Sequence, residues 1–186
     1  MKKTVCALLL AFSISAPAEL KELVRVDDHT YRGRQPQYED FSTLRQMGVK
    51  TVLDLRGGRI HKPREKRHAE AAGLQYISIR FSGVWEPHDE QVAQAVKVLE
   101  NPANWPVFIH CWRGYDRIGL VLACYHIDHD HWTNQHALDD ARQLGLNRFE
   151  FLLQRYIMNY TPPSHASQPA GPATGASQAS VPHAGT

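Results

Sequence analysis

The segment Val107-Phe108-Ile109-His110-Cys111-Trp112-Arg113-Gly114-Tyr115-Asp116-Arg117-Ile118-Gly119 decides the fold of this chain. Its apolar start, residues 107–110, predicts a short buried strand, and residues 118–127 predict a buried helix. A tight loop between them opens on Cys111 and closes on Arg117. A strand that turns directly into a helix aims backbone N–H groups and the positive helix end at one point. The segment therefore predicts an anion-binding site.

The residue types in this loop suit phosphate chemistry. An anion site stabilises the thiolate of Cys111 over the neutral thiol, and the thiolate is the nucleophilic form. The guanidinium of Arg117 can hold two phosphate oxygens at once. Gly114 gives the loop the torsional freedom to turn its amides inward.

The pattern His-Cys, five residues, then Arg resembles the signature loop of the protein tyrosine phosphatase superfamily. The order of segments over about residues 30–128 resembles its small bacterial dual-specificity-like branch. The matching outer segments are Tyr31-Arg32-Gly33-Arg34-Gln35-Pro36, Asp54-Leu55-Arg56, Glu70-Ala71-Ala72-Gly73-Leu74-Gln75-Tyr76 and Pro106-Val107-Phe108-Ile109-His110-Cys111. A rhodanese-like sulfurtransferase is an alternative, but a five-residue loop after His110 favours phosphate over sulfur chemistry.

The resemblance implies a metal-independent enzyme without a cofactor. Cys111 would form a phosphocysteine intermediate, and Arg117 would stabilise the transferring phosphoryl group. The substrate would be a phosphotyrosine or phosphoserine/threonine protein, or a phosphoinositide or inositol phosphate. The expected substrate-binding residues are His110, Trp112, Arg113, Gly114, Tyr115 and Ile118.

Ile118 departs from the family pattern, which places Ser or Thr directly after the arginine. A hydroxyl there helps to stabilise the departing thiolate, and isoleucine cannot donate that bond. Slow breakdown of the phosphoenzyme is therefore expected. The alternative function is a pseudophosphatase that binds phosphate but turns over poorly.

Three carboxylates are candidates for the general acid. Asp116 lies within the loop, where it resembles the loop aspartate of lipid-directed phosphatases; the alternative is an ion pair that shapes the loop. Asp89 and Glu86 lie in the segment where this family keeps its acid. Asp89 would also serve as a helix N-cap, and Glu86 as a solvated loop residue.

Further charged and histidine-rich residues could extend the site. Arg113 would form a basic rim that suits a multiply charged substrate, unless these arginines are solvated surface; its partners would be Arg32, Arg34, Arg56 and Arg59. A second cluster has spacings compatible with zinc, but a polar helix end explains it better; it comprises His126, Asp128, His129, Asp130, His131 and His136. Cys124 lies in an apolar helix and predicts a buried core thiol.

The chain divides into three parts. Residues 1–18 combine Lys2 and Lys3, an apolar stretch and Ala16-Pro17-Ala18, which predicts a bacterial signal peptide and export to the periplasm or medium. Residues 161–186 lack Lys, Arg, Asp and Glu and predict a disordered Ala/Ser/Pro/Gly-rich tail. No later segment is apolar enough to span a membrane. Removing residues 1–18 leaves 19 basic and 19 acidic residues, which argues against a nucleic-acid partner.

Residues 19–160 predict a single α/β domain with a central, mostly parallel sheet of four to five strands flanked by helices. Ligands in such sheets bind at the carboxyl ends of the strands, where the Cys111 loop lies. Strands are expected at residues 23–26 and 30–32, which form an edge pair, and at 49–55, 74–81 and 107–110. Helices are expected at residues 38–47, 64–72, 89–100, 118–127, 133–145 and 148–160.

Overall fold

Five strands form a single sheet in the order β1-β2-β5-β3-β4. The computed structural model describes residues 22–57, 62–83 and 85–163. All neighbouring strands are parallel except β1 and β2, which are antiparallel. The strands are β1 (Val24–Arg25), β2 (Thr30–Gly33), β3 (Thr51–Asp54), β4 (Gln75–Ser78) and β5 (Val107–His110). The α/β fold with a mostly parallel sheet is therefore confirmed.

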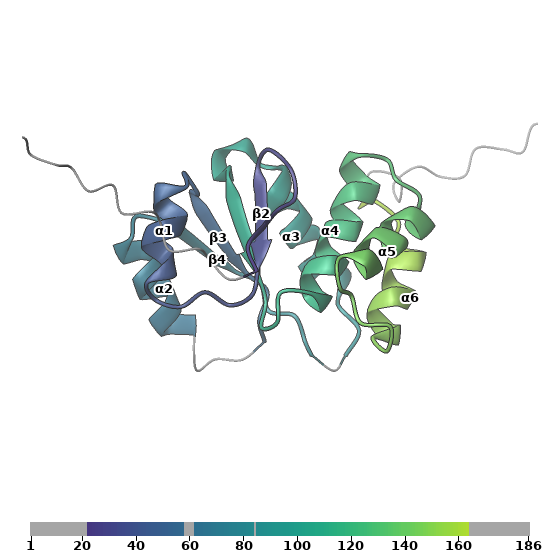
Figure 1. The fold of residues 1–186 in the computed structure, drawn as a ribbon. Coiled ribbons are helices and arrows are strands. Elements are labelled where there is room, and N and C mark those ends of the chain that lie inside the picture. The colour runs from purple at the N-terminus through teal and green to yellow at the C-terminus, as the bar shows by residue number, and fades with distance from the viewer. Residues whose placement is uncertain (1–21, 58–61, 84, 164–186) are drawn as a thin grey trace, which may run out of the picture.

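Helices cover both faces of this sheet, α1 and α2 on one side and α3 to α6 on the other (Figure 1). They are α1 (Asp40–Gln46), α2 (Lys62–Ala71), α3 (Asp89–Glu100), α4 (Asp116–His129), α5 (Asn134–Gln143) and α6 (Phe151–Asn159), with a 3₁₀ turn at Pro102–Asn104. Alternate strand residues feed two apolar cores. Val52 and Phe108 pack with the α1 and α2 side, whereas Leu53 and Ile109 join the larger core under α3 to α6.

The last strand in the chain lies at the centre of the sheet. Residues 107–110 of β5 pair with β2 on one side and β3 on the other. All four residues of β5 are buried, as their apolar run predicted. Cys111 directly follows the carboxyl end of β5. It therefore lies beside the middle of the sheet, at the end where the parallel strands finish.

Three element bounds differ from the sequence-based expectation in ways that affect the site. Strands β1 and β2 form the expected antiparallel pair at one side of the sheet, but of the two only β1 is an edge strand, because β2 also pairs with β5. The helix expected from residue 118 begins at Asp116, so Arg117 belongs to its first turn. The last helix begins at Phe151 rather than at residue 148, which leaves residues 147–150 as a turn.

Some sequence-based predictions fall on residues that the structure does not describe. These are the signal peptide at 1–18, Arg59 and the tail from residue 164 onward. Among the described residues, no helix combines the length and apolar character needed to cross a bilayer.

Candidate active site

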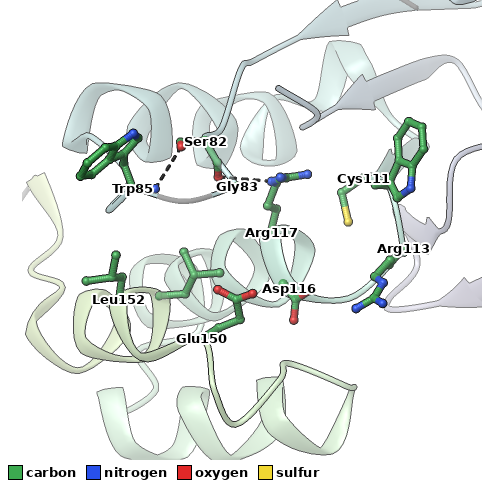
Figure 2. A pocket seen from close by; sticks show the side chains of 11 residues that line it. Ser82, Gly83, Trp85, Cys111, Arg113, Asp116, Arg117, Glu150 and Leu152 are labelled. Atoms are coloured by element: carbon green, nitrogen blue, oxygen red, sulfur yellow. Dashed lines mark hydrogen bonds between the residues drawn. The ribbon is translucent and has the colours of Figure 1, made fainter. Parts of the chain in front are cut away.

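A pocket of about 260 Å³ opens at the carboxyl end of β5 (Figure 2). Three segments far apart in sequence form its walls. They are residues 111–117, here called the P-loop, the loop 82–85, and the start of α6 with the turn before it. The described lining residues are Ser82, Gly83, Trp85, Cys111, Trp112, Arg113, Asp116, Arg117, Glu150, Leu152 and Leu153.

The thiol of Cys111 lies at the base of this pocket and is only 3% exposed. The backbone N–H of Gly114 donates a hydrogen bond to its Sγ atom over 3.3 Å. Gly114 has a φ of +90°, and a Cβ there would lie 2.9 Å from the backbone nitrogen of Arg34. Only glycine permits this close approach. The loop is therefore held in a shape that turns an amide toward the sulfur.

Arg117 enters the same pocket from the first turn of α4. Its Nε atom donates a long hydrogen bond of 3.4 Å to the carbonyl oxygen of Ser82. A Cβ on Gly83 would lie 2.6 Å from Nη2, so this glycine makes room for the guanidinium. Arg117 has no carboxylate partner among the described residues, which leaves its fork available to an anion.

The three predicted acid candidates lie in different places. Asp116 lines the pocket, and its Oδ1 accepts the backbone N–H of Asn147 at 2.9 Å. Glu86 accepts from Arg155 Nη2 at 2.8 Å, and Asp89 accepts from the Tyr156 hydroxyl at 2.8 Å. Glu86 and Asp89 line a neighbouring groove, and neither lines the Cys111 pocket. Glu86 also lines an adjoining groove that shares Arg117 with that pocket. Of the three, only Asp116 lines the pocket that contains Cys111.

A fourth carboxylate, Glu150, also lines the pocket and was missed by the sequence reasoning. Gly145 and Asn147 are turn residues that come before an apolar helix, so the sequence could have predicted that Glu150 lies at a helix start. Nothing local in the sequence directs that acid toward Cys111, because it arrives through the packing of α6.

The predicted substrate-binding residues separate into two groups. Trp112 and Arg113 line the pocket, and both are exposed. The other four do not line it. Gly114 is buried within the loop, and His110 is buried at the end of β5. Ile118 is fully buried in the larger core, and the Tyr115 ring packs over Gly145.

The expected basic rim is wrong for two of its arginines. Arg32 is buried and donates to the carbonyl oxygen of Leu144 at 2.9 Å. Arg56 is buried and pairs with Asp54 at 2.8 Å. Both belong to the interior because each charge has internal partners. Arg34 is half exposed and lies 4.0 Å from Glu22.

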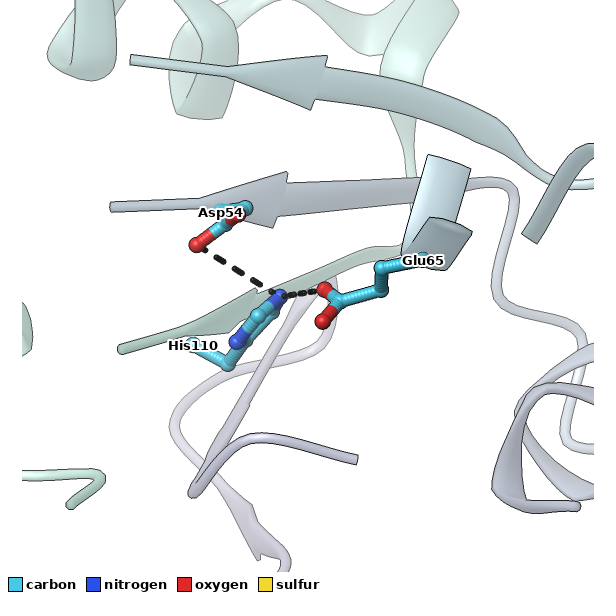
Figure 3. A group of neighbouring side chains, drawn as sticks. All are labelled: Asp54, Glu65 and His110. Carbon is cyan, nitrogen blue, oxygen red and sulfur yellow. Dashed lines mark ion pairs between the residues drawn. The ribbon is translucent and has the colours of Figure 1, made fainter. Parts of the chain in front are cut away.

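Arg56 belongs to a buried network behind the P-loop. Figure 3 shows three other members of this network, Asp54, Glu65 and His110. Its Nε and Nη2 donate to the two oxygens of Asp54 at 2.8 and 2.9 Å, and Nη2 also donates to Glu65. The Nε2 atom of His110 lies 2.9 Å from Glu65 Oε1. Burial alone would raise the pKa of Asp54, but the Arg56 hydrogen bonds and the nearby His110 lower it to about 2. The Tyr76 hydroxyl donates to Asp54 at 2.6 Å.

Asp54, Glu65 and His110 place three potential metal-ligand atoms within 4.8 Å of one another. The Arg56 guanidinium already contacts both carboxylates, so a metal cation there would meet a positive charge at close range. The three residues therefore fit a buried ion-pair network better than a metal centre.

The second histidine cluster is arranged as an aromatic stack. His126 Nδ1 lies 2.6 Å from Asp130, and the Trp132 ring stacks between the His126 and His136 rings. This arrangement is the polar helix end that the sequence favoured over zinc. Cys124 is buried, and burial raises the pKa of its thiol, as expected for a core residue.

Comparison with known proteins agrees with this geometry. The family model described as "DSP-PTPase phosphatase fused to NAD+ Kinase" matches residues 16–155. The chain is 27% identical over 142 residues to OCA1 of Mycosarcoma maydis, covering 71% of this chain and 85% of that protein. It is 28% identical over 136 residues to the inositol diphosphatase SIW14 of Saccharomyces cerevisiae, covering 70% of this chain and 47% of the yeast protein, about half its length.

Solved structures share the fold. The core catalytic domain of the yeast PP-IP phosphatase SIW14 superposes with a TM-score of 0.67 at 24% identity, covering 78% of this chain and 89% of that one. TpbA of P. aeruginosa in complex with pTyr gives 0.62 at 22% identity, covering 74% and 83%. Because the family model spans well over half of the sequence, the chain belongs to this family of DSP- and PTP-like phosphatases and is a hydrolase of that class.

Proposed function

We propose that the protein hydrolyses phosphate monoesters through a phosphocysteine intermediate. The observation that carries this proposal is the meeting of Cys111 and Arg117 in one pocket, with the Gly114 amide turned toward the sulfur. The thiolate attacks phosphorus, the bond to the leaving oxygen breaks, and Arg117 holds the phosphoryl oxygens. Water then attacks the phosphocysteine and releases inorganic phosphate and the thiolate.

A carboxylic acid must protonate the leaving oxygen if the alcohol is a poor leaving group. Asp116 is the sequence-based candidate that lies in this pocket, and Glu86 and Asp89 have other partners. We therefore propose that the acid is one of the carboxylates that line this pocket.

The substrate class follows from the relatives and the pocket. SIW14 is named an inositol diphosphatase, and TpbA was crystallised with pTyr. The exposed Arg113 adds a positive charge at the pocket, which suits either a phosphotyrosine protein or an inositol phosphate. We therefore propose a phosphorylated protein or an inositol phosphate as the substrate.

Purified protein should be assayed with para-nitrophenyl phosphate, a phosphotyrosine peptide and a panel of inositol phosphates, beside Cys111→Ser. Turnover that vanadate inhibits and that the mutant lacks supports the enzyme. Absence of both turnover and vanadate binding contradicts the proposal.

Ile118 supports a second candidate function. Its side chain is fully buried in the core that also contains Cys111, and it offers no hydroxyl to the departing thiolate. A phosphate-binding module with slow turnover would show tight vanadate binding, a burst of one equivalent of the leaving alcohol while the phosphoryl group stays on Cys111, and little steady-state activity.

We further propose that the protein is exported. The support is the sequence pattern of residues 1–18, with its charged start, apolar stretch and Ala-x-Ala site. N-terminal sequencing of protein from the periplasm should begin at Glu19. Recovery from the cytoplasm with residues 1–18 intact would contradict export.

A further inference from the structure

Glu150 is a carboxylate of the Cys111 pocket to which neither the sequence motif nor the comparisons give a role. It is half-buried and lines the pocket from the turn that precedes α6. Figure 2 shows its carboxylate turned into the pocket beside Asp116, on the side of the cavity that Leu152 also lines. Asp116 and Glu150 are the two carboxylates among the described lining residues.

The side chain of Glu150 has no structural task in the described part of the chain. The residue is the N-cap of α6, yet its carboxylate makes no capping hydrogen bond. No hydrogen bond or ion pair in the described residues uses it, in contrast with Glu86 and Asp89. A half-buried carboxylate without a partner is costly, and such groups concentrate at functional sites.

The turn that carries Glu150 is firmly held. The Glu150 N–H donates to the carbonyl oxygen of Asn147 at 3.0 Å. The Gln154 amide nitrogen donates to the carbonyl oxygens of Asn147 and Arg148 at 3.1 and 2.9 Å. Asp116 closes the arrangement by accepting the Asn147 N–H at 2.9 Å. Asp116 thus joins the first turn of α4 to the turn that presents Glu150.

The two carboxylates differ in where they can act. Asp116 is part of the P-loop segment that surrounds the phosphoryl group, and one of its oxygens is already engaged. In an in-line displacement the leaving oxygen departs on the side opposite the attacking sulfur, toward the mouth of the pocket. Ser82, Gly83 and Trp85 also line the pocket, and none of them is an acid. Glu86 lines an adjoining groove with Arg117, but its carboxylate accepts from Arg155. Glu150 is the pocket carboxylate that comes from outside the P-loop.

We propose that Glu150 is the general acid and base of the reaction, and that Asp116 is a positioning residue that holds its turn. This inference rests on the proposed phosphatase function. In the first step the thiolate forms the S–P bond, the P–O bond breaks, and the leaving oxygen takes the proton of Glu150. In the second step the Glu150 carboxylate removes a proton from water, whose oxygen attacks phosphorus while the S–P bond breaks.

The test compares Glu150→Gln, Glu150→Asp and Asp116→Asn with the wild type on two aryl phosphates. Phenyl phosphate has a poor leaving group and 2,4-dinitrophenyl phosphate a good one. Glu150→Gln should lower kcat/KM for phenyl phosphate about 100-fold and for the dinitrophenyl ester less than about fivefold. Glu150→Asp keeps a carboxylic acid and should restore part of the phenyl phosphate rate and the alkaline limb of its pH profile.

Asp116→Asn keeps an oxygen that can accept the Asn147 N–H. Its loss of kcat/KM on phenyl phosphate should therefore be smaller than that of Glu150→Gln, and it should be equal for both esters. Glu90→Gln, on the exposed start of α3, is the matched control and should leave kcat/KM for both esters unchanged. Equal losses on both esters in Glu150→Gln, or the leaving-group-dependent loss in Asp116→Asn instead, would overturn the proposal. If the wild type shows no turnover that Cys111→Ser removes, the phosphatase function itself has failed.

Discussion

Arg56 and Arg117 follow the carboxyl ends of adjacent parallel strands, β3 and β5, but lie in opposite surroundings. Arg56 is buried against Asp54 and Glu65, so its positive charge is neutralised by ion pairs inside the protein. Among the residues that the structure describes, Arg117 makes one long hydrogen bond, to the carbonyl oxygen of Ser82, and it faces an open pocket. The same residue type after two adjacent strands is therefore paired inside the protein in one case and available to an anion in the other, and its partners decide which.

The largest expected effect is on Arg117. Arg117→Lys keeps the charge but loses the planar fork, so kcat should fall about 10³-fold while the unfolding midpoint changes little. Steady-state kinetics and thermal unfolding measure the two quantities. A loss below tenfold would show that the guanidinium does not hold the transferring group.

Arg56→Met should reverse that pattern. It leaves two buried carboxylates without a counter-charge, so the free energy of unfolding should fall by about 3–5 kcal/mol. Urea denaturation measures it. Arg67→Met, on the exposed face of α2, is the matched control and should change stability by less than about 0.5 kcal/mol. Similar values for both variants would contradict the structural role of Arg56.

The buried network also predicts a pH dependence of stability. The pKa of Asp54 is about 2 in the folded protein, below its ordinary value near 3.9, so its stabilising contribution is complete above pH 4. It is lost as the pH falls toward 2, because the unfolded chain then binds the proton more readily. The loss should be about 2 kcal/mol. Denaturation of wild type and Asp54→Asn between pH 2 and 5 measures it; parallel curves would exclude Asp54 as the cause.

The smallest expected effect is at Ile118. Ile118→Thr places a hydroxyl in the core that contains Cys111 and should raise steady-state turnover several-fold by stabilising the departing thiolate. Valine has the shape of threonine without the hydroxyl, so Ile118→Val should not raise steady-state turnover. A burst assay separates phosphoenzyme formation from breakdown. An equal gain in both variants would assign the effect to packing.

Local patterns were enough to predict much of the fold. Strand β5 and helix α3 have the bounds that the sequence predicted, because an apolar run before a tight loop and an amphipathic repeat are short-range signals. The strand–loop–helix arrangement around Cys111 follows from the same kind of signal. The meeting of Cys111 and Arg117 in one pocket required only seven consecutive residues to fold as expected.

Long-range contacts set the limits of the sequence analysis. Arg32 was expected on the surface, but its partner Leu144 lies 112 residues away. Glu150 reaches the pocket through a turn held by Asp116, and the Asp116–Asn147 bond spans 31 residues. Neither contact leaves a pattern in nearby residues, so the burial of Arg32 and the placement of Glu150 became visible only in three dimensions.

The central position of β5 has a consequence for how the pocket comes into being. This strand is the last of the five in the chain, yet β2 and β3 contact each other only through it. A chain that has been synthesised only as far as residue 106 lacks the strand that joins the two halves of its sheet. The thiol of Cys111 lies four residues beyond the start of β5. It therefore reaches its folded surroundings only when β5 pairs with β2 and β3 and completes the sheet.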